Sequence, residues 1–289
     1  GIGRLYSKWY SEVRLLKRAV TAIQNEFKGF IMENDTEISF PTPVVAWTTL
    51  AILFLAYISS FVDRMIISLL VEPIKADFQI SDTQISLLLG LSFAIFYCLA
   101  ALPIGRLVDI WSRKKIITVG ITLWSFMTAL CGLAQNYTQL FLARIGVGVG
   151  EASLAPAAYS MLADSFPPKK LGLAMGVFTM GTAVGAGLAL IIGGAIISFV
   201  TGENGENVSL FGISFLSGWQ WVFVLVGLPG LFIALLTSLI REPDRIVIKE
   251  KKKLYGDISI PISEVKKFFK INADFYIPHH FAVGCSNLA

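Results

Sequence analysis

The sequence predicts an all-α membrane protein built as a bundle of six transmembrane helices. Of its 289 residues, 55% are hydrophobic and only 15% are charged, whereas a soluble domain carries roughly 25% charged residues. Its apolar residues form long, continuous runs, and a bilayer-spanning helix needs about 20 of them. Because the runs do not alternate with polar residues, transmembrane strands are not expected.

The six predicted spans cover residues 44–71, 85–105, 116–134, 139–162, 171–200 and 219–240. They divide the chain into four parts. Residues 1–43 precede the bundle of 44–240, residues 241–272 form a basic linker, and residues 273–289 begin a seventh helix that the end of the chain cuts off. Residues 1–31 carry apolar side chains at steps of three and four, which is typical of an amphipathic helix on a membrane surface. Alternatively, Met32 is the native start and the residues before it are foreign.

The basic residues orient the bundle. With the N-terminus in the cytoplasm, Lys75 is the one lysine or arginine of the outer loops, Arg64 and Arg144 lie inside spans, and all the others are cytoplasmic. By the positive-inside rule, this asymmetry predicts a multi-pass protein of the cell (inner) membrane with a cytoplasmic N-terminus.

Four charged residues interrupt two of the spans, Asp63 and Arg64 in the first and Arg144 and Glu151 in the fourth. An ion at bilayer depth costs at least a few kcal/mol, so such residues usually face a polar cavity or a partner and mark a transport pathway. From the helical rise, Asp63 lies roughly 6 Å and Arg144 roughly 9 Å outward of mid-span, which allows the two to pair. Glu151, near mid-membrane, is two turns from Arg144 on one helix face.

A carboxyl group between the opposing effects of desolvation and a nearby arginine can take up and release a proton near neutral pH. Our hypothesis is therefore that Asp63 and Glu151 carry a coupling proton. Arg64 and Arg144 would set their charge state or hold an anionic head group. The alternative is a static ion-pair network that only fixes the packing of the helices.

A second motif joins spans two and three on the predicted cytoplasmic side, where Gly105 and Asp109 are followed by the basic residues Arg113, Lys114 and Lys115. Glycine permits a tight reversal of the chain. Asp109 can cap a helix end or pair with the basic cluster. We expect Gly105, Asp109, Arg113 and Lys114 to act in cytoplasmic gating.

This loop resembles the signature between helices two and three of the major facilitator superfamily. The chain departs from the pattern at Ile110, where a basic residue is usual, and at Ser112, where glycine is frequent and serine is similar to the Spinster-like branch. Other segments that look Spinster-like are Asp63-Arg64, Arg144 to Ser153 with Pro156 after it, Asp164 to Pro167, Gly218 to Trp221, and Arg241 to Pro243.

The resemblance implies a fold of twelve helices in two six-helix halves, each half made of two inverted three-helix repeats. This chain would be the N-terminal half with the start of helix seven, and its partner would be the missing C-terminal half of the same chain. Spinster-like proteins are proton-linked or facilitative carriers of amphipathic lipids such as lysophospholipids and sphingoid phosphates.

Glycines within the spans predict close helix contacts, foremost Gly148 and Gly150 in span four and the pair Gly181 and Gly185 in span five. The pair Gly172 and Gly176 has the same spacing. Gly146, Gly148 and Gly150 also match a nucleotide-loop pattern, but no strand precedes them, so we interpret them as packing residues. Pro156 is expected either to kink span four or to be tolerated there.

Together these features predict a secondary active transporter that works by alternating access, is proton-linked, and moves an amphipathic lipid or a small organic anion. The alternatives are a major facilitator carrier of a sugar acid or drug, a half-carrier that dimerises, and a non-transporting membrane scaffold. The sequence contains no nucleophile–base set, metal cluster or strand-linked phosphate loop, so neither an enzyme nor a cofactor is expected. The basic linker is expected to face the membrane surface rather than nucleic acid.

Overall fold

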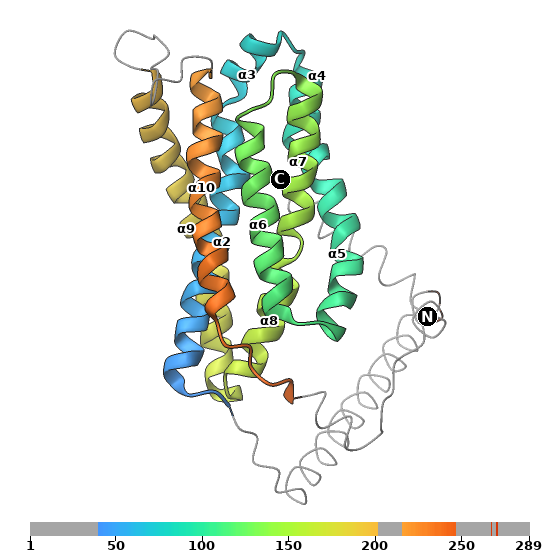
Figure 1. The fold of residues 1–289 in the computed structure, drawn as a ribbon, viewed down its shortest axis with the longest axis vertical. Helices are drawn as coiled ribbons and strands as arrows, with labels where there is room; N and C mark the ends of the chain where they lie inside the picture. The colour runs from blue at the N-terminus through green and yellow to red at the C-terminus, as the bar shows by residue number, and fades with distance from the viewer. Residues whose placement is uncertain (1–39, 202–215, 247–266, 268–269, 271–289) are drawn as a thin grey trace, which may run out of the picture. The chain divides into compact units, whose positions relative to one another are not determined.

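The computed structural model describes residues 40–201, 216–246, 267 and 270. The predicted amphipathic helix, most of the linker and the seventh helix lie outside these residues. The described helices, shown in Figure 1, are α2 (Pro43–Leu69), α3 (Val71–Phe78), α4 (Asp82–Ser86), the π-helix η1 (Leu87–Leu91), α5 (Ser92–Ile110), α6 (Arg113–Cys131), α7 (Tyr137–Glu151), α8 (Leu154–Ser165), α9 (Pro168–Thr201) and α10 (Gly218–Leu239). Within these ranges no strand occurs.

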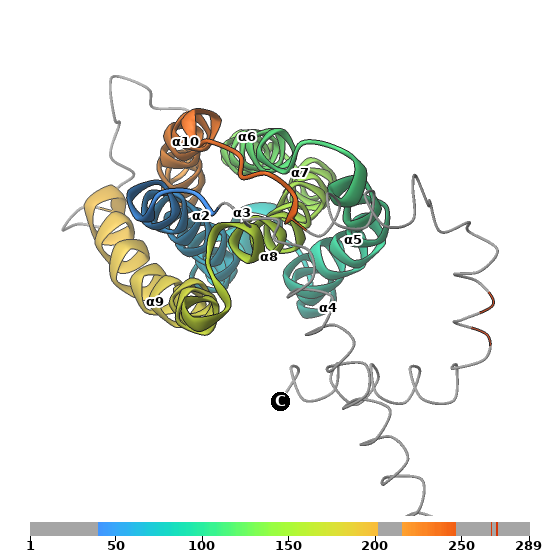
Figure 2. The same cartoon turned by 90° about the horizontal axis from the view of Figure 1, so that it is seen from below.

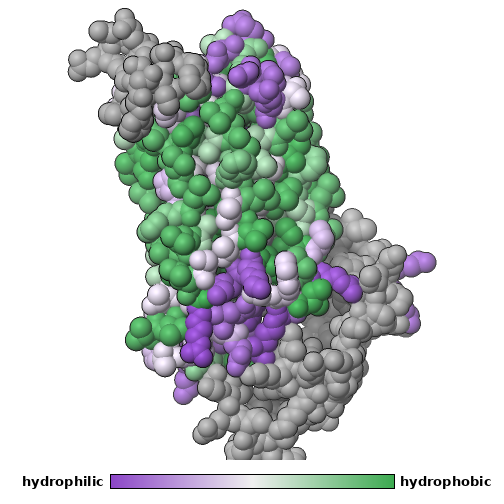
Figure 3. All heavy atoms as spheres, viewed as in Figure 1, coloured by the Kyte–Doolittle hydropathy of each residue, from purple (hydrophilic) through white to green (hydrophobic). Residues whose placement is uncertain are grey.

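Among the described residues, six helical segments are long and apolar enough to cross a membrane, which confirms the predicted fold class. They cover Pro43–Leu69, Asp82–Ile110, Arg113–Cys131, Tyr137–Ser165, Pro168–Ser198 and Gly218–Leu239. On the face shown in Figure 3, hydrophobic residues form a belt across the middle of the bundle, and hydrophilic residues gather at its two ends. The chain is therefore an integral, multi-pass membrane protein.

Span two is longer than its apolar run. It begins at α4, where Ser81 and Gln84 form a reciprocal capping box, and α5 ends only at Ile110. A helix ends where other groups form hydrogen bonds with its terminal N–H and C=O groups. Hydropathy, by contrast, identifies only the apolar part of the helix. The span therefore also includes the polar residue Asp109, which lies beyond its predicted end at residue 105.

Span four is broken near its centre, where α7 ends at Glu151 and α8 begins at Leu154. Pro156 is the third residue of α8, a position where its missing N–H leaves no helical hydrogen bond unmade. Ser153 between the two helices donates its hydroxyl to the carbonyl of Gly150, with 2.8 Å between the oxygens. Span four is thus interrupted just before Pro156, and the break follows directly after the buried carboxylate.

The contacts between spans follow the symmetry of two inverted three-helix repeats. Span one packs on span five (α2 on α9), and span two packs on span four (α5 on α7). Exchanging the two repeats replaces span one by span four and span five by span two. The contact of span one with span five therefore becomes the contact of span four with span two. Spans three and six, α6 and α10, pack on each other and are exchanged as a pair. Seen from the end in Figure 2, α9 lies beside α2 while α5 lies beside α7.

Glycines bring several of these helices together. A Cβ atom on Gly185 of α9 would lie 2.6 Å from Cβ of Phe61 and 2.9 Å from the carbonyl oxygen of Ile58, both on α2. One turn earlier, Gly181 faces the rings of Phe54 and Tyr57 on the same helix. By contrast, a Cβ atom on Gly172 or Gly176 would meet no atom within 4 Å, so that second pair makes no close contact among the described residues.

We predict that Gly185→Ala lowers the free energy of unfolding by about 1–3 kcal/mol, because the added methyl group overpacks the α2–α9 contact. Thermal unfolding in detergent measures this change as a fall of about 2–4 °C in Tm for each kcal/mol. Gly187→Ala on the same helix is the matched control, since a Cβ atom there meets nothing within 4 Å. Equal effects of the two variants would show that this contact does not constrain the bundle.

Candidate functional site

A buried ion pair joins spans one and four near mid-membrane. Oε2 of Glu151 accepts a hydrogen bond from Nη2 of Arg64 at 2.5 Å and one from Oγ of Ser60 at 3.0 Å. The side chain of Glu151 is fully buried, while that of Arg64 is 27% exposed. Glu151 lies at the midpoint of the Tyr137–Ser165 span. Its other oxygen, Oε1, is buried without a hydrogen-bond partner in the described part of the chain.

The predicted pair of Asp63 with Arg144 is not formed. Arg144 instead donates from Nη1 to the backbone carbonyl of Asp63, at 3.4 Å. The carboxylate of Asp63 faces Arg144 and Thr128, yet neither of its oxygens has a hydrogen bond of normal geometry within the described ranges. The two residues do lie at the same depth, as their distances from mid-span predicted. The rotation of each helix about its axis decides which atoms meet, and sequence spacing does not give that rotation.

Aromatic rings surround the guanidinium group of Arg64. Its Cζ lies 4.8 Å from the ring centroid of Phe61, 4.6 Å from that of Phe93 and 5.5 Å from that of Tyr97. The ring of Phe93 also lies 5.6 Å from Cζ of Arg144. These distances are within the range of cation–π attraction, which is strongest where water is excluded.

This arrangement is suited to reversible protonation. An ionised carboxylate in a low-dielectric site requires a cationic partner, so adding a proton to Glu151 would remove most of its attraction to Arg64. Arg64 is the partly exposed member of the pair and can bind another anion.

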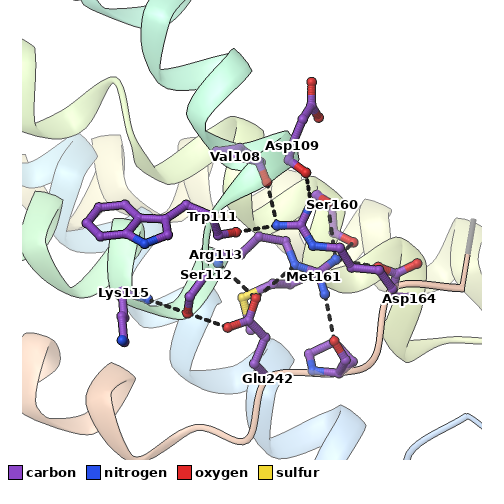
Figure 4. Close-up of polar contacts among 12 residues, drawn as sticks. Val108, Asp109, Trp111, Ser112, Arg113, Lys115, Ser160, Met161, Asp164 and Glu242 are labelled. Carbon is purple, nitrogen blue, oxygen red and sulfur yellow. Dashed lines mark hydrogen bonds and ion pairs between the residues drawn. The ribbon is translucent and has the colours of Figure 1, made fainter. Parts of the chain in front are cut away.

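A second polar cluster lies at the end of the bundle where α5, α8 and α10 end and α6 begins, here named the basic end (Figure 4). Its centre is Arg113, which is fully buried. The guanidinium of Arg113 contacts the carboxylate of Asp164 and the carbonyl and hydroxyl of Ser160 on α8, at 3.1 and 3.2 Å. It also donates to the carbonyl of Pro243 at 2.7 Å.

Glu242, just after α10, completes this cluster. Its Oε1 accepts from the backbone N–H of Arg113 at 2.8 Å and from its Nε at 3.3 Å, while its Oε2 accepts from the hydroxyl of Ser112. Partial burial opposes the ionisation of Glu242, but these hydrogen bonds outweigh it and hold the pKa of Glu242 below its ordinary value of 4.5. The carboxylate also sits at the N-terminus of α6, where the helix dipole favours negative charge.

Arg245 ties the same segment to the end of α5. Its guanidinium donates to the backbone carbonyls of Val108, at 2.7 Å, and of Asp109 and Trp111. Carbonyls in the last turn of a helix have no intrahelical partner, so a cation placed there satisfies them. Together, Arg113 and Arg245 join the ends of α5, α6, α8 and α10.

The structure corrects two expectations for the cytoplasmic motif. Gly105 lies inside α5 and does not make the reversal, which falls at Trp111 and Ser112. Asp109 does not cap α6, because Ser112 does so by accepting from the backbone N–H of Lys115. The side chain of Asp109 is exposed and points away from the cluster in Figure 4. Lys114 is partly exposed, and no ion pair involves it among the described residues.

Sequence reasoning gave no role to Asp164, Glu242 and Arg245, which hold this end together. Asp164 and Glu242 lay in segments that looked Spinster-like, and each follows directly after a predicted span. A lone acidic residue beside a basic loop is a usable signal for such a clamp. The signal does not tell which arginine or lysine it meets.

Comparison with known proteins now identifies the family. Residues 53–288 match the model of the Major Facilitator Superfamily. The chain belongs to this superfamily. It is 32% identical, over 77% of its length, to protein spinster homolog 1 of Xenopus tropicalis, and it covers 40% of that protein. It is also 31% identical, over 68% of its length, to an MFS-type efflux pump of Mycolicibacterium smegmatis, of which it covers 42%. The chain thus spans less than half the length of these relatives.

Solved structures agree with this placement. A bacterial homologue of the human lysosomal transporter Spinster, in an inward-facing and unoccupied conformation, matches with a TM-score of 0.65 and 38% identity over 71% of this chain and 45% of that one. The inward-open xylose transporter XylE from E. coli matches with a TM-score of 0.56 over 80% of this chain and 56% of that one, but at 16% identity it shows the fold alone. The predicted superfamily and its Spinster-like branch are confirmed.

We predict that acid weakens the basic end through Glu242. Because folding lowers the pKa of Glu242, its contribution to stability is complete above about pH 4.5 and is lost as the pH falls through the lower folded value. Glu242→Gln should therefore lower Tm at neutral pH, and its difference from the unchanged protein should shrink as the solution is acidified. Thermal unfolding across pH measures this, with Glu72→Gln on the exposed surface of α3 as the control. A difference that stays constant with pH would contradict the assignment.

Proposed function

We propose that this chain forms the N-terminal half of a secondary active transporter that works by alternating access. It would couple proton movement to transport of an amphipathic lipid or a small organic anion, and it would require a C-terminal six-helix half. The relatives described above are more than twice as long as the part of them that this chain covers, which supports the need for that half.

The Arg64–Glu151 pair is the observation that carries the proposal. A structural ion pair deep in a membrane is an expensive way to fix helices, because the desolvation of both ions must be offset by near-complete hydrogen bonding. Here the bonding is incomplete, since Oε1 of Glu151 and both carboxylate oxygens of Asp63 have no hydrogen bond among the described residues. Under-satisfied acids are poor stabilisers and good proton acceptors.

The surroundings of Arg64 support an amphipathic anion as substrate. The partly exposed guanidinium supplies positive charge, and the partly exposed rings of Tyr57, Phe61 and Tyr97 supply apolar surface next to it. A lysophospholipid or sphingoid phosphate combines these two requirements. A sugar acid is the second candidate, because this chain is 29% identical over 65% of its length to a probable L-galactonate transporter of Escherichia coli. Arg64 can bind a carboxylate as well as a phosphate.

The basic end is proposed to act as the gate on the cytoplasmic side. Arg113 holds three segments together there, and opening this end would break its contacts with Asp164 and Glu242. The remaining motif residues would act in the gate by contacting the second half of the carrier. They are Gly105, Asp109 and Lys114.

The proposed orientation, with the N-terminus and the basic end in the cytoplasm, is open to a labelling test. Starting from a cysteine-free variant, Gln135→Cys places a thiol at the opposite end of the bundle and Lys170→Cys places one at the basic end. In intact cells, a membrane-impermeant maleimide should label Gln135→Cys and spare Lys170→Cys. The reverse labelling would invert the topology.

We predict that Glu151→Gln abolishes the pH dependence of transport, because the amide cannot carry the proton. The measurement is uptake of a fluorescently tagged lysophospholipid by liposomes that contain the full-length carrier, with and without a pH gradient. Galactonate serves as the competing probe for the sugar-acid alternative. The surface variant Glu72→Gln should behave like the unchanged carrier. Gradient-driven uptake that survives in Glu151→Gln would refute the proton role, and no uptake of either probe by the unchanged carrier would favour a non-transporting scaffold.

A further inference from the structure

We propose that Phe93 is a positioning residue for the coupling site, because its one aromatic ring holds the guanidinium groups of both intramembrane arginines. This inference rests on the proposed function of the Arg64–Glu151 pair and adds a residue that the motifs did not single out. Phe93 is in the second span, whereas the four charged residues are in the first and fourth.

The geometry centres on the ring. Its centroid lies 4.6 Å from Cζ of Arg64 and 5.6 Å from Cζ of Arg144. Phe93 is only 8% exposed, so little water competes for either cation. The ring of Tyr97, one turn later, stacks on that of Phe93 with 5.5 Å between centroids and an interplanar angle of 24°. A desolvated aromatic face is a better partner for a guanidinium than an exposed one.

The fold brings Phe93 to this position by two local devices. The π-helix Leu87–Leu91 ends two residues before it, and such a turn shifts the register of the helix that follows. On the facing helix, Gly148 lies on the same face as Arg144 and Glu151, one turn from each. A Cβ atom on Gly148 would lie 2.8 Å from the backbone carbonyl oxygen of Phe93. Because Gly148 has no side chain, Phe93 can approach α7 between the levels of Arg144 and Glu151.

Holding both arginines gives the ring a role in proton coupling. The two arginine side chains carry like charges and repel each other. Without the ring, each would move toward whichever nearby carboxylate is ionised. The ring attracts both and fixes where each can reach, Arg64 on the carboxylate of Glu151 and Arg144 on the backbone carbonyl of Asp63. A weaker ring would hold Arg64 less firmly on Glu151, and the carboxylate would lose part of its attraction to that cation.

Other ionisable groups also face this site. Those within electrostatic reach of the pair or of Asp63 and Arg144 are Tyr57 on α2, Tyr97 on α5, Cys131 on α6, and Tyr159, which faces Tyr57 from α8. Changing the ring of Phe93 replaces none of these groups. Because Tyr97 stacks on that ring, a shift caused by the change reports on the two arginines together with this stacked tyrosine.

The test replaces Phe93 in the full-length carrier with phenylalanines carrying one, two or five ring fluorines. Fluorine removes the negative charge of the ring face while nearly preserving its shape. We expect the midpoint of the pH profile of lysophospholipid uptake to move upward step by step, by roughly half to one pH unit across the series. Phe93→Leu should match the most fluorinated ring. The same series at Phe96, whose ring makes no cation–π contact with either arginine, is the matched control.

An unchanged midpoint across the Phe93 series, in a carrier whose uptake still depends on pH, would overturn the positioning role and leave Phe93 as a packing residue. An equal shift at Phe96 would also overturn it. A carrier whose uptake does not depend on pH even with the natural Phe93 would instead refute the proposed function. Because the fluorinated rings are nearly isosteric, Tm should change little, and a large loss of Tm without a shift in midpoint would count against the proposal.

Discussion

The scarcity of water at mid-membrane is the constraint on which this structure depends. With no solvent to stabilise it, the carboxylate of Glu151 needs a cation and a hydroxyl from another helix, and Arg64 and Ser60 of α2 supply both. The pair joins α2 to α7, and the break in span four follows directly after it. Gly148 and the aromatic rings around Arg64 are further consequences, since the helices must approach closely and the cation must be shielded from lipid.

The two charge clusters differ in how fully they are satisfied. Arg113 at the basic end has partners on α8 and after α10 for its guanidinium, and its contacts use two carboxylates, a hydroxyl and two carbonyls. The mid-membrane cluster leaves both oxygens of Asp63 and one of Glu151 without hydrogen bonds in the described chain. Complete bonding favours one arrangement strongly, whereas incomplete bonding leaves alternatives of similar energy. The first cluster thus joins the helix ends with nearly complete hydrogen bonding, and the second is where we propose a change of protonation state.

The repeat symmetry explains why the charges lie where they do. Spans one and four are the first helices of the two repeats, so they occupy equivalent places and meet near the axis that relates the repeats. Each carries one acid and one arginine, yet the acids and arginines are used unequally. Arg64 bonds a carboxylate and Arg144 a backbone carbonyl. Two equivalent helices thus carry charged residues with different partners. We regard such a place as suited to a residue that gains and loses a proton.

The sequence by itself determined the six spans, their grouping into repeats, the superfamily and the four charged residues of the membrane interior. The spans and their charges follow from composition and helical rise, which act locally along the chain, whereas the superfamily and the repeats were implied by the resemblance of the motifs. Only the tertiary structure decided that Arg64 rather than Arg144 meets Glu151, that the chain reverses at Trp111 and Ser112, and that Glu242 and Arg245 close the basic end. Those outcomes depend on the rotation and offset of whole helices, and packing over many residues sets them. A pairing of two charges therefore becomes known only when the helices that carry them are in place.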